Sequence, residues 1–182
     1  QFHNLPIHTV ATTGNLEIAR MLLDAGAEID AGDSDNSTAL GVAALRGHEA
    51  LVAFFIEKGA DVNRRDRKAD CPLSFAVSGR DTVVIRQLLQ AGADLYYRNP
   101  HGDTLLHSAS ARGPRDFVEY LLNHGAEVDA CNQDGATPLG YAAMQGQTAV
   151  AGLLLDRGAD PNAGRPEQLA PLVYIPGTRG SL

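Results

Sequence analysis

The 182-residue sequence contains no tryptophan, and aromatic residues make up only 5% of it. A core for a chain of this length must therefore be built mainly from leucine, valine, isoleucine and alanine. Cysteine is also scarce, because Cys71 and Cys131 are the only two. Two such distant cysteines form neither a disulfide framework nor a metal-ligand pattern. We therefore expect two reduced thiols and an intracellular protein.

Long apolar runs and an excess of positive charge are missing as well. No run approaches the length of a membrane-spanning helix, and the N-terminus lacks the charged and apolar parts of a signal sequence. The net charge of -7 argues against general nucleic-acid binding. We expect neither membrane nor nucleic-acid partners. Because the chain does not start with methionine, we also expect a fragment or a processed form.

What the sequence does contain is a pattern that recurs every 33 residues. Glycine, alanine and an acid follow one another five times, starting at Gly26, Gly59, Gly92, Gly125 and Gly158. An apolar residue keeps the same spacing at Ile7, Leu40, Leu73, Leu106 and Leu139. Each copy holds two short apolar runs, and helices of that length are not stable alone in water. The copies must therefore stack on one another.

The last full copy, Thr137 to Asn162, shows the unit most clearly. Thr137 is a good helix N-cap, Pro138 suits the first helical position, and glycines end both helices. The preceding copy starts with Thr-Leu-Leu-His at 104–107. A 33-residue helix-turn-helix unit with such a start resembles the ankyrin repeat. The resemblance runs from Leu5 to Gly164.

The resemblance implies an all-α ankyrin-repeat solenoid of stacked helix-turn-helix units with hairpin fingers. Five repeats would occupy residues 1–164, with approximate bounds 1–32, 33–65, 66–98, 99–131 and 132–164, and the first would be incomplete at its start. Residues 165–182 are predicted to form a partial sixth repeat or an irregular C-terminal cap. Ala170-Pro171-Leu172 keeps the phase, and Pro176 and Gly177 then interrupt it.

The third repeat is the least regular. Gly79 comes one place early, so Arg80 occupies a position that favours left-handed glycine, at a cost of roughly 1 kcal/mol. Tyr96 replaces the Asn or Asp of the other copies. Cys71 replaces the helix-capping threonine, where a lowered thiol pKa is possible and a structural role is favoured.

The resemblance also implies a partner protein bound on a concave face of fingers and inner helices. The fingers would expose Ser34, Asp35, Ser37, Arg67, Lys68, Asp70, Pro100, His101, Asp103, Gln133, Asp134 and Ala136. Arginine and tyrosine are enriched at binding hot spots, so the middle of this face predicts an acidic or extended partner segment. A solvated set of turn charges is the alternative. The candidate contacts are Arg46, Arg64, Arg65, Arg67, Lys68, Tyr97, Arg98, His101, Arg112 and Met144.

No pattern in the sequence predicts a catalytic, cofactor or metal site. The histidines lack metal-ligand spacing, and the glycines are helix stops rather than a phosphate-binding loop. His8 and His107 stand where the family uses the ring in hydrogen bonds between loops. Asn63 and Asn162 resemble asparagines that are hydroxylated in some ankyrin proteins, although a role in holding the loop is favoured.

We therefore predict a monomeric, non-catalytic scaffold for protein–protein interaction. An alternative is the substrate-recognition segment of a larger enzyme or effector, with catalysis outside this chain. A third hypothesis is that the stack itself catalyses a reaction or holds a small ligand around Arg80, Tyr96 and Tyr97.

Overall fold

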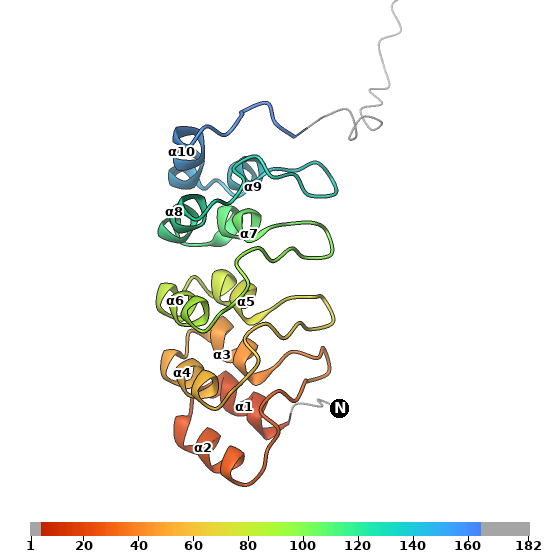
Figure 1. Cartoon of the computed structure of the whole chain (residues 1–182), viewed down its shortest axis with the longest axis vertical. Helices are drawn as coiled ribbons and strands as arrows, with labels where there is room; N and C mark the ends of the chain where they lie inside the picture. Colours follow the sequence, from red (N-terminus) through yellow and green to blue (C-terminus); the bar gives the residue numbers. More distant parts are fainter. Residues whose placement is uncertain (1–4, 165–182) are drawn as a thin grey trace, which may run out of the picture.

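A computed structural model describes residues 5–164, which form a stack of helix pairs (Figure 1). In this range the chain has ten helices and, apart from two isolated bridges, no strand. The predicted all-α solenoid is thus confirmed, and the predicted sixth repeat or cap lies outside the described residues. The helices are α1 (Pro6–Thr13), α2 (Leu16–Asp24), α3 (Ala39–Arg46), α4 (Glu49–Glu57), α5 (Pro72–Gly79), α6 (Thr82–Gln90), α7 (Leu105–Arg112), α8 (Arg115–Asn123), α9 (Pro138–Met144) and α10 (Thr148–Asp156).

The helices form two layers beside a row of fingers. The odd-numbered helices make the inner layer, next to the hairpin fingers, and the even-numbered helices make the outer layer (Figure 1). The bridges Gly32–Thr38 and Arg98–Thr104 close two of the fingers. Within residues 5–164, no helix has the length and apolarity that crossing a bilayer requires.

Local sequence explains where the inner helices begin. The hydroxyls of Thr38, Thr104 and Thr137 accept hydrogen bonds from backbone N–H groups three residues later, which caps the helix. Behind each cap, a leucine or isoleucine of the 33-residue pattern enters the core. Leu40, Leu73 and Leu106 are all buried. The core is therefore continuous along the inner layer.

The early glycine of the third repeat has a packing reason. A Cβ atom on Gly79 would lie 2.6 Å from the carbonyl oxygen of Leu45 in α3, so α3 and α5 can approach this closely only with glycine there. The helix ends at Gly79, and the next residue, Arg80, adopts the left-handed conformation with φ of 62°. The expectation for Arg80 is confirmed.

Replacing Arg80 with glycine should raise the free energy of unfolding by about 1 kcal/mol, because glycine adopts this conformation without the Cβ penalty. Urea denaturation measures the change. The control Arg112→Gly places glycine in the last turn of α7 and should lower stability by up to about 1 kcal/mol. A neutral or destabilising Arg80→Gly would show that Arg80 is not strained.

The junction between the pairs α5/α6 and α7/α8, here called the third junction, lacks hydrogen bonds that other junctions have. At the other three junctions, the side chain of Asp30, Asn63 or Asp129 accepts an N–H from the loop of the next pair, at 2.8 to 3.1 Å. The equivalent residue at the third junction is Tyr96. Its ring offers no carboxylate or amide oxygen to that loop.

Two prolines remove further hydrogen bonds from the third junction. Neighbouring fingers are joined by Arg67 N–H to Asp35 O at 2.8 Å and by Gln133 N–H to His101 O at 2.9 Å. Pro100 occupies the equivalent place and has no N–H to donate.

The second proline acts at the start of an outer helix. The ring of His48 and the side chain of Gln147 reach carbonyl oxygens of the preceding pair, at 3.1 and 3.2 Å. Pro114 stands in the same slot and cannot do so. Accordingly, α6 packs on α4 and α8 packs on α10, whereas α6 and α8 hardly touch.

Candidate protein-binding face

Each finger is shaped by one acid or amide at its base. The carboxylate of Asp66 accepts hydrogen bonds from the N–H groups of Lys68 and Asp70, at 2.8 and 2.9 Å, and from the hydroxyl of Ser37 at 3.2 Å. Asp33, Asn99 and Asn132 do the same in the other fingers. Their 33-residue spacing is visible in the sequence but was not used in predicting the surface. Asp66, the one acid in the Arg64–Lys68 run, therefore stabilises the turn of its finger.

Six of the ten predicted contacts lie on two successive fingers. These residues, here called the finger patch, are all exposed: Arg64, Arg65, Arg67, Lys68, Arg98 and His101. The two ion pairs within residues 5–164 both involve Glu119, far from the fingers in sequence. None of the finger cations is thus paired with a carboxylate of the described part of the chain.

Two cations of the finger patch are held by the protein itself. The guanidinium of Arg65 lies 5.0 Å from the centroid of the Tyr97 ring, a cation–π arrangement. Arg98 donates to the carbonyl oxygen of Gly102 at 2.9 Å. Arg67 and Lys68 form the tip of their finger. Their side chains make no hydrogen bond within residues 5–164, so the tip is the freest part of the patch.

Tyr97 requires a correction, because it was predicted as an exposed contact. Only 2% of the residue is exposed, and its hydroxyl lies 3.4 Å from the carboxylate of Asp70. Burial, and secondly the charge of Asp70, raise the pKa of this hydroxyl well above its usual range. Its neighbour Tyr96 is 75% exposed. Tyr96 lies in the turn before Tyr97, where its N–H donates to the carboxylate of Asp94 at 2.9 Å, and only Tyr97 enters the core.

The remaining three predicted contacts lie at the far ends of inner helices. Arg46, Arg112 and Met144 are exposed last residues of α3, α7 and α9. Because an eight-residue helix is about 12 Å long, they stand apart from the fingers that precede these helices. The structure thus divides the predicted set into the finger patch, a row of helix ends, and buried Tyr97.

Asp103 was predicted on the exposed finger surface and is instead buried. Its carboxylate accepts hydrogen bonds from Asn132 at 2.7 Å, from the hydroxyl of Tyr141 at 2.8 Å and from Asn99 at 3.0 Å. Burial alone would raise the pKa of Asp103, but these hydrogen bonds outweigh it and lower the pKa. Asp103 therefore joins two fingers rather than facing a partner.

The histidines of the Thr-x-x-His slot have the structural role that was predicted. The Nε2 atom of His107 lies 3.0 Å from the carbonyl oxygen of Ala136, and Nδ1 accepts from the N–H of Thr104 at 3.1 Å. His8 contacts Ala31 O in the same way, at 3.0 Å. Burial lowers the pKa of His107 below its ordinary 6.5.

Stability should therefore fall as the pH drops below 6.5. The unfolded chain takes up a proton at the histidine first, so the contribution of neutral His107 is present above pH 6.5 and is lost as the pH falls through the lowered folded pKa. In this window the free energy of unfolding should decrease by up to about 1.4 kcal/mol per pH unit for this group.

Urea denaturation between pH 7.5 and 5 measures this slope. His107→Gln should flatten it, whereas His101→Gln, at an exposed finger residue, should leave it unchanged. Equal slopes in all three proteins would rule out a contribution from His107.

Both cysteines are free thiols, as predicted. Cys71 is buried at the start of α5, and burial raises the pKa of its thiol despite hydrogen bonds from Ser74 and Leu73 that act the other way. A raised pKa disfavours the reactive thiolate. Cys71 therefore replaces the capping threonine structurally.

Arg80, Tyr96 and Tyr97 do not come together around one cavity. Tyr96 lines a hollow of about 200 Å³ with Leu95 and Arg98, and neither Arg80 nor Tyr97 contributes to it. The small-ligand hypothesis for these three residues thus loses its geometric basis.

Comparison with known families agrees with this architecture. The family model described as ankyrin repeats (3 copies) matches residues 1–66 and 70–165. No curated protein matches the chain. The helix pairs and the histidine hydrogen bonds between loops lie within the matched residues, and so do the fingers except for residues 67–69. This chain belongs to the ankyrin repeat family.

Proposed function

We propose that this chain is a non-catalytic scaffold whose concave face binds a partner protein, with the finger patch contacting an acidic segment of that partner. Ankyrin repeats are in general protein–protein interaction modules. The observation that carries the specific proposal is the charge of the finger patch. Five exposed arginine and lysine side chains lie on two successive fingers of a chain with a net charge of -7.

Electrostatics supports an acidic partner segment. Positively charged side chains on neighbouring fingers repel one another, and a row of carboxylates on the partner would relieve this repulsion. Complementary charge also steers association and raises its rate. Since the overall charge is negative, attraction for an acidic partner is confined to the patch, which fixes where that partner can dock.

The fingers are also pre-organised for binding. Asp66 fixes the turn that carries Arg67 and Lys68, and Arg67 N–H is bonded to the neighbouring finger at Asp35 O. Arg65 is held on the Tyr97 ring. Little backbone entropy is therefore lost when a partner docks, and more of the interaction energy appears as affinity.

Reversing the charge at the finger tip tests the proposal. The double variant Arg67→Glu/Lys68→Glu changes two side chains that make no contact needed for the fold. Binding of a fluorescein-labelled oligoglutamate peptide, followed by fluorescence anisotropy at low salt, should weaken by about tenfold or more, or roughly 1.4 kcal/mol. Added salt should weaken binding to the unaltered protein too.

The matched control is Arg20→Glu/Arg115→Glu, which makes the same change in net charge at exposed positions of the outer helices α2 and α8. This control should bind within about twofold of the unaltered protein. Equal losses in both variants would mean that only net charge matters, and no loss in either would remove the finger patch from the binding face.

A further inference from the structure

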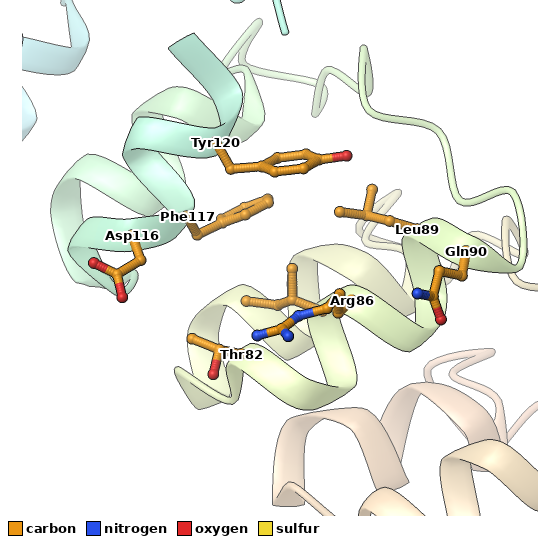
Figure 2. A pocket seen from close by; sticks show the side chains of 8 residues that line it. Thr82, Arg86, Leu89, Gln90, Asp116, Phe117 and Tyr120 are labelled. Atoms are coloured by element: carbon orange, nitrogen blue, oxygen red, sulfur yellow. The ribbon is translucent and has the colours of Figure 1, made fainter. Parts of the chain in front are cut away.

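A cleft of about 460 Å³ opens between α6 and α8 (Figure 2). Both helices belong to the outer layer, away from the fingers (Figure 1). Its volume lies in the range of small-molecule sites. Five lining residues come from α6 and three from α8: Thr82, Ile85, Arg86, Leu89 and Gln90, and Asp116, Phe117 and Tyr120.

The cleft exists because of the sequence at the third junction. Tyr96, Pro100 and Pro114 each remove a hydrogen bond that draws neighbouring helix pairs together elsewhere in the stack. The outer helices α6 and α8 consequently hardly touch. Apolar side chains that would pack between them instead line an opening.

The cleft has one aromatic wall and one aliphatic wall. The rings of Phe117 and Tyr120 are stacked, with centroids 6.1 Å apart and planes 18° apart, and His124 stacks on Tyr120 at 3.9 Å. Both labelled rings project from α8 toward Leu89 of α6 (Figure 2). Together with Ile85, these side chains leave an apolar slot beside near-parallel rings, which favours a flat aromatic body.

One cation stands at this slot. Arg86 is exposed on α6, and its guanidinium lies beneath the Phe117 ring in Figure 2. No carboxylate within residues 5–164 forms an ion pair with it. The carboxylate of Asp116 points away from the two rings (Figure 2). A planar guanidinium beside an apolar slot suits a carboxylate attached to a ring.

We propose that this cleft is a binding site for a planar aromatic carboxylate. The ring packs between the Phe117–Tyr120 stack and Leu89, and the carboxylate pairs with Arg86. Such a ligand contacts both α6 and α8, so it joins the two halves of the stack and raises the melting temperature. The site is separate from the finger patch and does not depend on the function proposed for it.

Indole-3-acetate is a suitable probe, because the protein contains no tryptophan and the indole emission is free of protein indole background. Titration followed by fluorescence gives the affinity. Amide chemical shifts should change in residues 82–90 and 116–124. Changes confined to other parts of the chain, or no saturable binding up to millimolar concentrations, would overturn the proposal.

Three comparisons test the chemistry. Arg86→Gln should weaken binding of indole-3-acetate by about tenfold or more, whereas Arg46→Gln, on the inner layer, should leave it unchanged. The neutral indole-3-acetamide should bind the unaltered protein about tenfold more weakly than the acid and should not distinguish it from Arg86→Gln. Equal binding of acid and amide to the unaltered protein would overturn the assignment of Arg86.

A variant that fills the cleft tests whether binding can be lost while the fold is kept. Leu89→Trp places a large side chain in the slot and should abolish binding while the far-UV circular dichroism and the melting temperature are retained. Because this variant carries its own indole, its binding is followed by amide chemical shifts rather than by fluorescence. Undiminished binding to a folded Leu89→Trp variant would place the ligand elsewhere. The Arg67→Glu/Lys68→Glu variant should bind indole-3-acetate normally, so failure at one site is distinguishable from failure at the other.

Discussion

Replacing Tyr97 with alanine is expected to lower the free energy of unfolding by about 3–5 kcal/mol, as for other buried aromatic residues. The ring is 2% exposed, and it supports the guanidinium of Arg65 on one side. It also stands at the third junction, where the hydrogen bonds of the other junctions are missing. The cavity left by alanine would therefore weaken a junction that already lacks these hydrogen bonds.

Equilibrium urea denaturation of Tyr97→Ala, Tyr97→Phe and Tyr96→Ala measures this effect. Tyr97→Phe keeps the ring and loses only the long hydroxyl contact with Asp70, so it should cost about 1 kcal/mol or less. Tyr96→Ala changes a residue that is 75% exposed and should alter the free energy of unfolding by no more than about 0.5 kcal/mol. Similar losses at Tyr96 and Tyr97 would contradict the burial described here.

Replacing Leu121 with alanine is expected to cost about 2–5 kcal/mol, because this side chain is fully buried in α8. In a repeat stack, stability is a sum of the intrinsic stability of each unit and its interfaces with neighbours. Since α8 packs on α10 and hardly touches α6, the loss should spread toward the C-terminal pairs rather than toward α5 and α6.

Hydrogen exchange locates this loss. In Leu121→Ala, amides of α7 to α10 should exchange faster, while those of α1 to α4 should keep their protection. Leu155→Ala, at a residue that is 47% exposed, is the matched control and should cost less than about 1 kcal/mol. A uniform loss of protection along the stack would show that the third junction is as strong as the others.

The 33-residue pattern predicted the helix pairs and the fingers because both rest on local rules. Capping threonines, left-handed glycines and short amphipathic runs fix an element wherever they occur. Even the irregular Arg80 followed from its place in the repeat. The reason for Gly79 did not, because the 2.6 Å approach to Leu45 O depends on how two helices pack.

The candidate site was predictable only in part. Exposed Arg67 and Lys68 follow from their place at a finger tip. Periodicity could not tell which of Tyr96 and Tyr97 enters the core, since one lies in a turn and the other directly follows it, where side chains follow no regular alternation. Asp103 was misplaced because its three hydrogen-bond donors come from two different fingers and from α9, which no local pattern brings together.

The cleft could not be predicted from the sequence, although the residues that produce it are identifiable there. Tyr96, Pro100 and Pro114 are separate departures from the repeat pattern. Each removes a single hydrogen bond, which one junction could tolerate. Their combined effect appears only when the three positions are seen to serve the same junction.

The finger patch straddles this junction. Arg67 and Lys68 belong to the finger before α5, and Arg98 and His101 to the finger before α7. We expect bending of the stack to concentrate at the third junction, because α6 and α8 hardly touch there, and the cations of the finger patch lie on both sides of it. A partner that binds both fingers would therefore fix the angle between the two halves of the stack. The width of the cleft between α6 and α8, on the opposite side, would change with that angle.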